Sequence, residues 1–295
     1  MKNVSLRVIH ISDPHFSHIT YNPKQFLTKR WLGNCNLILF RQKAYQTRHL
    51  VHIPELVEQL AVEAVFITGD FSTTSIDEEF VKAKEFVKEF EKRNLPVYCL
   101  PGNHDCYTKE AERSKRFYHH FPSEGLKNNR IEKVELGKGW WWIGLDCALA
   151  TSLIRSNGYF FPEMEKSLEK ALSQIPSDEN VIIGNHFPLY GSGRPRHDLA
   201  RGQALREMIK RYPQVKLYLH GHDHTPYIIE KREENLPLVL NSGSCAHQPK
   251  GTFYLLELDD KGCLVQRFFF RKEDESFSWV VDWQKQFKFY TISEK

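Results

Sequence analysis

The sequence lacks the features that would place it outside ordinary globular proteins. No run in its 295 residues approaches the roughly 18 consecutive apolar residues that a membrane-spanning helix requires. The six cysteines form no Cys-x-x-Cys pair, which argues against a disulfide framework or a thiolate metal site. Repeats, low-complexity segments and linkers are also lacking. We therefore expect a single domain over residues 1–295.

The charge balance is mildly basic, with 41 Lys and Arg against 37 Asp and Glu. This balance allows an anionic substrate, but there is no marked basic stripe, so no nucleic-acid partner is expected. The first residues lack the apolar stretch and the small-residue cleavage site of a signal peptide. A reducing, cytoplasmic compartment is the expectation that follows.

Short runs rich in β-forming residues alternate with amphipathic patterns through most of the chain. The predicted strands are 7–12, 64–69, 96–101, 140–146, 181–185 and 215–220. The predicted helices are 54–60, 77–93, 162–175 and 199–212. From about residue 226 the pattern is mostly β, in runs at 226–230, 236–241, 252–258, 262–271 and 277–283. This order predicts an α/β protein with two sheets flanked by helices.

One segment, from about residue 16 to 52, does not fit this alternation. It leaves the end of the first predicted strand, where an insertion is placed to cover a site. Within it, Lys29, Arg30 and Arg41 flank apolar residues. Two interpretations of residues 29–48 stay open: a lid packed on the domain, or a lid that also binds a lipid or touches a membrane surface peripherally.

Residue types that bind metal ions follow five of the predicted strands. They are Asp13 and His15, Asp70, Asn103 followed by His104 and Asp105, His186, and His222 and His224. Ligand sites in open α/β sheets lie beyond the carboxyl ends of strands, so we expect these side chains to converge. In the Asp-x-His and His-x-His pairs, residues two apart on extended backbone would point the same way. Glycines before Asp70, Asn103 and His222 suit tight turns or close backbone approach.

The donor set predicts the kind of metal and the chemistry. Carboxylate, amide and imidazole groups without a thiolate suit manganese, iron or zinc. Two such divalent ions, bridged by a carboxylate, lower the pKa of a bound water and clamp the oxygens of a phosphate. A histidine beside the ions can then protonate the leaving oxygen.

Together, these motifs resemble the full motif set of the calcineurin-like metallophosphoesterases. The resemblance covers residues 7 to about 245 and includes the turn at 241–244. It implies a four-layer αββα sandwich of two mixed β-sheets and a dinuclear metal centre. One ion would be held by Asp13, His15, Asp70 and His224. The other would be held by Asp70, Asn103, His186 and His222, with Asp70 as the bridge.

The resemblance also implies roles beside the ions. His104 would stay off the metals, as proton donor or phosphoryl-oxygen ligand, oriented by Asp105. Thr73 stands where many members carry a second Asp, which puts the support of the ligands in doubt but not the ligands themselves. In the glycine-rich stretch 191–197, Arg194 and Arg196 either belong to a plain connection or pair with substrate phosphate.

The implied reaction is hydrolysis of a phosphate ester or phosphoanhydride by a hydroxide that bridges the ions. Two substrate classes stay open. Residues 29–40 resemble insertions in the bacterial branch related to UDP-2,3-diacylglucosamine pyrophosphatases, which implies a nucleotide-linked lipid and a location at the inner face of the membrane. The alternative is a soluble phosphodiester, such as a cyclic nucleotide. A non-catalytic scaffold of the same fold is disfavoured by the intact ligand set, and a nuclease by the lack of a basic stripe.

Overall fold

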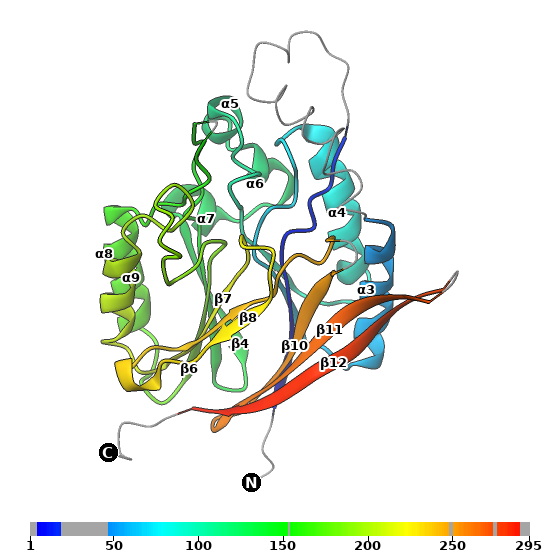
Figure 1. Ribbon diagram of the computed structural model, residues 1–295. Helices are drawn as coiled ribbons and strands as arrows, with labels where there is room; N and C mark the ends of the chain where they lie inside the picture. The colour runs from blue at the N-terminus through cyan, green and yellow to red at the C-terminus, as the bar shows by residue number, and fades with distance from the viewer. Residues whose placement is uncertain (1–4, 19–46, 153, 248–249, 274–275, 290–295) are drawn as a thin grey trace.

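The computed structural model describes residues 5–18, 47–152, 154–247, 250–273 and 276–289, which form two β-sheets (Figure 1). The first sheet has the strand order β12-β11-β10-β1-β2-β3 and the second has the order β4-β5-β6-β7-β9-β8. The strands of the first sheet are β1 (Leu6–Ile11), β2 (Ala64–Ile67), β3 (Val97–Cys99), β10 (Thr252–Leu258), β11 (Gly262–Glu273) and β12 (Ser276–Lys288). Those of the second are β4 (Ile131–Gly137), β5 (Trp140–Leu145), β6 (Asn180–Gly184), β7 (Val215–His220), β8 (Tyr227–Ile229) and β9 (Leu238–Asn241).

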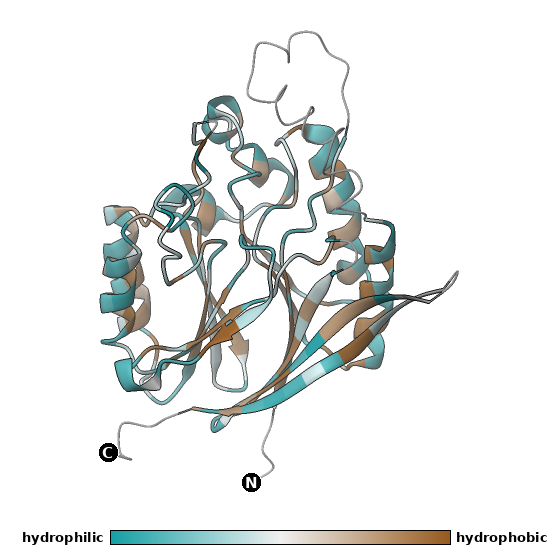
Figure 2. Ribbon diagram, in the orientation of Figure 1, coloured by the Kyte–Doolittle hydropathy of each residue, from teal (hydrophilic) through white to brown (hydrophobic). Residues whose placement is uncertain are grey.

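Helices cover the outer face of each sheet. The described helices are α3 (His52–Gln59), α4 (Asp77–Glu91), α5 (Lys109–Arg113), α6 (Arg116–His120), α7 (Glu124–Asn129), α8 (Pro162–Ser173) and α9 (Gly202–Ile209), with 3-10 turns η3 (Arg48–Val51) and η4 (Arg232–Glu234). Figure 1 shows α3 and α4 on one side of the molecule and α8 and α9 on the other. The outward sides of α8 and α9 are mainly hydrophilic in Figure 2, as expected of helices that bury one face.

The core lies between the two sheets and under the helices. The ring of Phe66 on β2 stacks on that of Trp142 on β5, with centroids 4.2 Å apart, so the sheets are packed face to face. Phe80 and Phe90 of α4 belong to the same apolar cluster. Leu168 of α8 lies in a second cluster on the other side of the second sheet. The expected αββα layering of two mixed sheets is therefore confirmed.

The predicted strands and helices of the α/β part are present, but one strand and three short helices were not predicted. β4 pairs antiparallel with β5 through a turn that contains Lys138 and two glycines with positive φ. Most of its side chains are only partly buried, so its sequence carries no clear period of two. Helices α5, α6 and α7 have only five or six residues each, which is too few to show helical periodicity.

The predicted insertion lies largely outside the described residues. Of its ends, Phe16 forms an isolated bridge with Ser72 and Arg48–Val51 form η3. Lys29, Arg30 and Arg41 fall in the segment 19–46, which lies outside the described part of the chain. Among the helices that the structure describes, none has the length and apolar character needed to cross a bilayer.

Candidate metal centre

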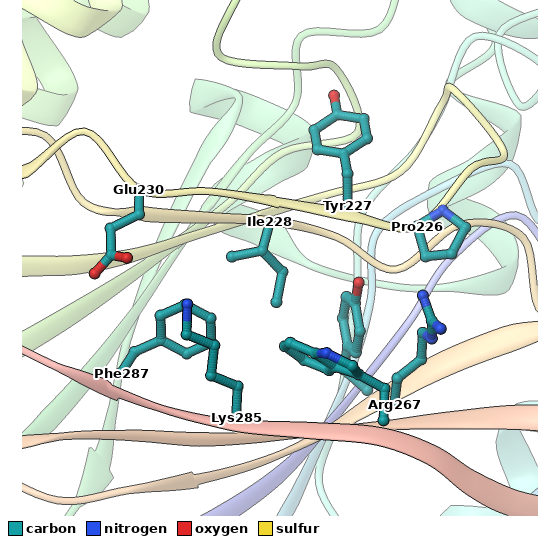
Figure 3. Close-up of a pocket in the computed structure, with 9 residues that line it drawn as sticks. Pro226, Tyr227, Ile228, Glu230, Arg267, Lys285 and Phe287 are labelled. Atoms are coloured by element: carbon teal, nitrogen blue, oxygen red, sulfur yellow. The ribbon is translucent and has the colours of Figure 1, made fainter.

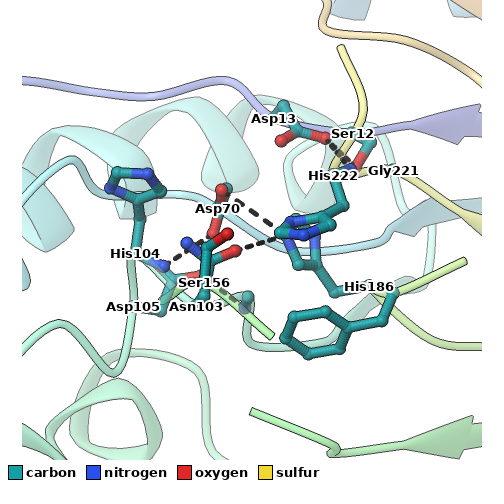
Figure 4. Close-up of polar contacts among 12 residues, drawn as sticks. Ser12, Asp13, Asp70, Asn103, His104, Asp105, Ser156, His186, Gly221 and His222 are labelled. Carbon is teal, nitrogen blue, oxygen red and sulfur yellow. Dashed lines mark hydrogen bonds and ion pairs between the residues drawn. The ribbon is translucent and has the colours of Figure 1, made fainter. Parts of the chain in front are cut away.

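The carboxyl ends of strands from both sheets meet at one edge of the sandwich. β1, β2 and β3 run parallel to one another in the first sheet, and β5, β6, β7 and β9 do so in the second. The loops that follow five of these strands carry the residues expected to bind metal. Figure 4 shows five of them, Asp13, Asp70, Asn103, His186 and His222, with His104 and Asp105 beside them. The structure therefore brings together groups that lie up to 211 positions apart in the chain, from Asp13 to His224.

The first group of candidate ligand atoms lies close enough together to hold a metal ion. Asp13, His15, Asp70 and His224 each offer one atom, and these atoms all lie within 4.8 Å of one another. Nε2 of His224 lies 3.0 Å from both Nε2 of His15 and Oδ1 of Asp13. The Asp70 Oδ2 atom is 3.7 Å from His15 Nε2. This is the set expected for the first ion.

The second group shares Asp70 with the first. Oδ2 of Asp70 lies 3.4 Å from Nε2 of His186. That nitrogen is 3.2 Å from Oδ1 of Asn103 and 3.2 Å from Nδ1 of His222. All four side chains are buried. Asp70 thus lies between the two groups, where a bridging carboxylate would have to be.

Backbone carbonyls fix which ring nitrogen of two histidines carries hydrogen. Nδ1 of His186 lies 2.7 Å from the Thr68 carbonyl, and Nε2 of His222 lies 3.0 Å from the His197 carbonyl. Because a carbonyl only accepts, each of these nitrogens donates, and the lone pair of each neutral ring is on the other nitrogen. Those two lone pairs face each other at 3.2 Å. Such an arrangement needs a cation or a proton between them, so the donor set fits a divalent ion.

Burial and neighbouring charges shift the pKa values of the site's residues when no metal is bound. Burial lowers the pKa of His222 well below its ordinary value. Burial also acts to lower the pKa of His186, but the Asp70 carboxylate, Asp13 and the hydrogen bond to the Thr68 carbonyl together outweigh it and raise that pKa to about 9. For Asp70, burial acts to raise the pKa, yet the neighbouring His186 and His104 hold it well below the ordinary range. The Asp70 carboxylate is therefore charged at neutral pH.

The ligand loops are left-handed turns and not extended backbone. Asp13, His15, Asp70, His222 and His224 have φ of 54°, 45°, 57°, 74° and 56°. The expectation that the paired ligands point the same way because the backbone is extended is therefore wrong. Non-glycine residues in this region cost about 1 kcal/mol or more each. Hydrogen bonds hold the turns: the Asp13 amide donates to the Gly69 carbonyl and the His15 amide to the Asp70 carbonyl, both at 3.0 Å.

Two glycines allow this close packing, as their positions before ligands predicted. Gly69 has φ of +102°, and a Cβ there would lie 2.6 Å from Nδ1 of His186. A Cβ on Gly221 would lie 1.9 Å from the Ser12 hydroxyl. Both distances are well inside van der Waals contact, so any side chain at either position would displace a neighbour of the site.

His104 lies beside Asp70, but Asp105 does not orient it in the way expected. The His104 amide donates to Oδ1 of Asp70 at 2.8 Å, and its ring Nδ1 lies 2.7 Å from the Thr73 carbonyl. The Thr73 carbonyl therefore fixes the ring, and Nε2 is the basic nitrogen of the neutral form. The Asp105 carboxylate instead accepts from the amides of Phe71, Ser72 and Gly102. It holds the loops after β2 and β3 together.

A buried carboxylate that the sequence analysis missed supports the loop at Thr73. Glu79, in the first turn of α4, accepts from the amides of Thr73 at 3.2 Å and Thr74 at 2.7 Å. The Thr73 hydroxyl donates to the Phe16 carbonyl at 3.2 Å. The signal that could have found Glu79 is its spacing, three residues after the residue that precedes the helix, which is typical of a capping carboxylate.

The arginines expected to bind phosphate lie in an exposed loop beside the second group. Nη2 of Arg194 lies 3.6 Å from Oδ1 of Asp223, with the Arg194 side chain 64% exposed. Arg196 is exposed as well. The loop also brings in His197, whose ring stacks on that of His222 with centroids 3.9 Å apart. A role for His197 was not predicted, because nothing in a glycine-rich stretch shows which ring this histidine will contact.

Comparisons with known proteins agree with this geometry. Residues 6–226 match the family described as calcineurin-like phosphoesterase. A 3',5'-cyclic adenosine monophosphate phosphodiesterase, CpdA, of Haemophilus influenzae is 28% identical over 55% of this chain and 54% of its own length. A probable glycerophosphodiester phosphodiesterase, GpdQ, of Arcobacter nitrofigilis is 30% identical over 63% of this chain and 64% of its own. The chain thus spans between about half and two thirds of these curated relatives.

A solved structure extends the similarity to nearly the whole chain. A dimetal phosphatase from Danio rerio aligns with 97% of this chain and 99% of its own, with a TM-score of 0.67 and 13% sequence identity. At that identity the match shows a shared fold. The family match over residues 6–226, together with the residues that meet at the strand ends, shows that the chain belongs to the calcineurin-like phosphoesterase family.

Proposed function

We propose that this protein is a metal-dependent phosphodiesterase that hydrolyses a small, soluble phosphodiester such as a cyclic nucleotide. The observation that carries the proposal is Asp70, whose carboxylate lies between two groups of metal-binding atoms. A shared carboxylate is what a pair of ions a few ångström apart requires. Ligands for one ion are Asp13, His15, Asp70 and His224, and for the other Asp70, Asn103, His186 and His222.

The ligand groups, His104 and Asp105 have different roles in the proposed hydrolysis. The two groups of residues would hold two divalent ions, which would supply an activated water and withdraw charge from the phosphate oxygens. His104, with Nδ1 bonded to the Thr73 carbonyl, holds at Nε2 the proton that passes to the leaving oxygen. Asp105 accepts hydrogen bonds from both of the loops that carry Asp70 and His104, and so holds these loops together.

The relatives favour a phosphodiester over a pyrophosphate-linked lipid. The name of CpdA gives a cyclic nucleotide as its substrate, and the name of GpdQ gives a glycerophosphodiester. The lipid interpretation rested on residues 29–48, of which 29–46 lie outside the described part of the chain, so nothing described supports it. The intact ligand set and His104 also favour an enzyme over a scaffold of the same fold.

A substrate panel tests the proposal. The metal-free protein, reconstituted in turn with manganese, iron or zinc, would be assayed on bis-p-nitrophenyl phosphate, 3',5'-cyclic AMP, a glycerophosphodiester and a UDP-linked diacylglucosamine lipid. We expect metal-dependent cleavage with the highest kcat/KM on one of the two small natural diesters. Preference for the UDP-linked lipid would overturn the substrate class. Failure to cleave any substrate with metal bound would favour a scaffold.

A further inference from the structure

A chain of hydrogen bonds lies outside the ligand set and ends on one of its members. The ring of His197 lies between two partners, with Nδ1 2.9 Å from the Ser156 hydroxyl and Nε2 3.1 Å from Oδ1 of Asp223. Asp223 in turn accepts from the Tyr227 hydroxyl at 2.8 Å and from the Asn241 amide at 3.3 Å. Both ring nitrogens of His197 are therefore engaged, which fixes the plane of the ring.

Residue 197 acts on His222 in two ways, through its ring and through its backbone carbonyl. It stacks on the His222 ring with centroids 3.9 Å apart and 22° between the planes. The His197 carbonyl also accepts from Nε2 of His222 at 3.0 Å, which leaves the lone pair of His222 on Nδ1. Nδ1 is the nitrogen that faces His186 in the second group of ligands. Position and tautomer of His222 thus both depend on where residue 197 lies.

We propose that His197 is a positioning residue for the second metal ion. Clamped by Ser156 and Asp223, it sets the tautomer and ring orientation of His222. The inference rests on the proposed function, since it takes His222 to be a ligand. Groups that orient metal-binding histidines in this way typically change metal affinity 10–100-fold when they are removed.

The hydrogen bonds that hold His197 also extend, through Asp223, to a more distant surface. Tyr227 begins β8 and lines a cavity of about 260 Å³ between β8 and strands β10 to β12 (Figure 3). Its hydroxyl is the donor to Asp223. Asp223 is therefore held from both the loop side and the sheet side, which explains how an exposed glycine-rich loop keeps His197 in one place.

The test compares two histidines in matched surroundings. His120 on α6 also contacts a carboxylate, Asp77 Oδ1 at 3.0 Å, and stacks on an aromatic ring, that of Phe80, but it is not part of the site. His197→Ala, His197→Phe and the control His120→Ala would be titrated with Mn²⁺ in competition with a chelating dye. Phe keeps an aromatic ring stacked on His222 but cannot make the hydrogen bonds to Ser156 and Asp223. Comparing it with Ala therefore separates the contribution of the stack from that of the hydrogen bonds. The Phe variant also replaces the Ala variant if that one does not fold.

We expect His197→Ala and His197→Phe to lower the affinity for the second ion roughly 10–100-fold, with the first ion bound as in the wild type. His120→Ala should bind both ions as the wild type does. Unchanged affinity in both His197 variants, or equal loss at both ions, would overturn the role of His197 alone. A wild-type protein that binds fewer than two ions would overturn the proposed function and this inference together.

Discussion

At the residue scale, the site depends on which atom of each side chain faces its neighbours. The Thr73 carbonyl holds Nδ1 of His104, and the amide of His104 is bonded to Asp70. The ring is therefore linked to the Asp70 carboxylate through the His104 amide, and it is not among the four residues of the first group. This geometry suits a proton donor that stays beside the ions.

Replacing His104 should separate catalysis from metal binding. We expect His104→Ala to retain two ions per chain and to lower kcat by roughly 10²–10⁴, the usual contribution of a general acid. Metal content by atomic emission and kcat on bis-p-nitrophenyl phosphate would be measured on the same sample, with His120→Ala as the control. Full turnover in His104→Ala would remove the residue from the mechanism.

Replacing Asp70 should remove metal binding as well as activity, because its carboxylate lies in both groups. We expect Asp70→Ala to lose both ions and all activity together, while Asp77→Ala, which removes an exposed carboxylate on α4, keeps both. Metal content after dialysis against buffered Mn²⁺ is the measurement. Two ions retained in Asp70→Ala would show that the carboxylate does not bridge them.

The convergence of the expected ligands could be predicted from sequence, but the contacts that support them could not. Asp13, His186 and the other expected ligands are recognisable because each follows a β-forming run. The actual partners of Asp105 and the stack of His197 on His222 are contacts between distant segments. Spacing carries no information on such contacts, so Asp105 was assigned the wrong partner and His197 was missed.

At the element scale, α4 does more than cover the first sheet. Its first-turn residue Glu79 is buried and accepts from the amides of the loop that carries Thr73. Burial raises the pKa of Glu79 from its ordinary value of 4.5 to about 7. The start of the helix thereby supports the carbonyl that orients His104.

This buried carboxyl predicts a pH dependence of stability. Between pH 4.5 and about 7 the folded protein keeps a proton on Glu79 that the unfolded chain releases, so the free energy of unfolding falls as pH rises through this window. From pH 5 to pH 8, we expect the wild type to lose about 2–3 kcal/mol relative to Glu79→Gln, which cannot titrate. Urea unfolding of both proteins measures this. A free energy of unfolding of the wild type that, relative to that of Glu79→Gln, stays constant or rises from pH 5 to pH 8 would contradict it.

At the scale of the whole molecule, the ions would join two sheets. Asp13, Asp70 and Asn103 follow strands of the first sheet, whereas His186, His222 and His224 follow strands of the second. The alternation of strands and helices made this layering predictable. The place of β4 at the edge of the second sheet was not, because a half-buried edge strand has little apolar signal.

Metal should therefore stabilise the fold as a whole. A ligand that binds only the folded state adds about 2.7 kcal/mol at one hundred times its Kd. We expect Mn²⁺ to raise the Tm of the wild-type protein and an added chelator to reverse the rise, with no shift in Asp70→Ala. Calorimetry with and without metal is the check, and an equal shift in Asp70→Ala would point to binding elsewhere.

The most direct test of the dinuclear site is anomalous X-ray diffraction from crystals grown with Mn²⁺. The arrangement described above predicts two anomalous peaks, one among Asp13, His15, Asp70 and His224 and one among Asp70, Asn103, His186 and His222, with the Asp70 carboxylate between them. A single peak, or peaks that do not touch Asp70, would contradict it.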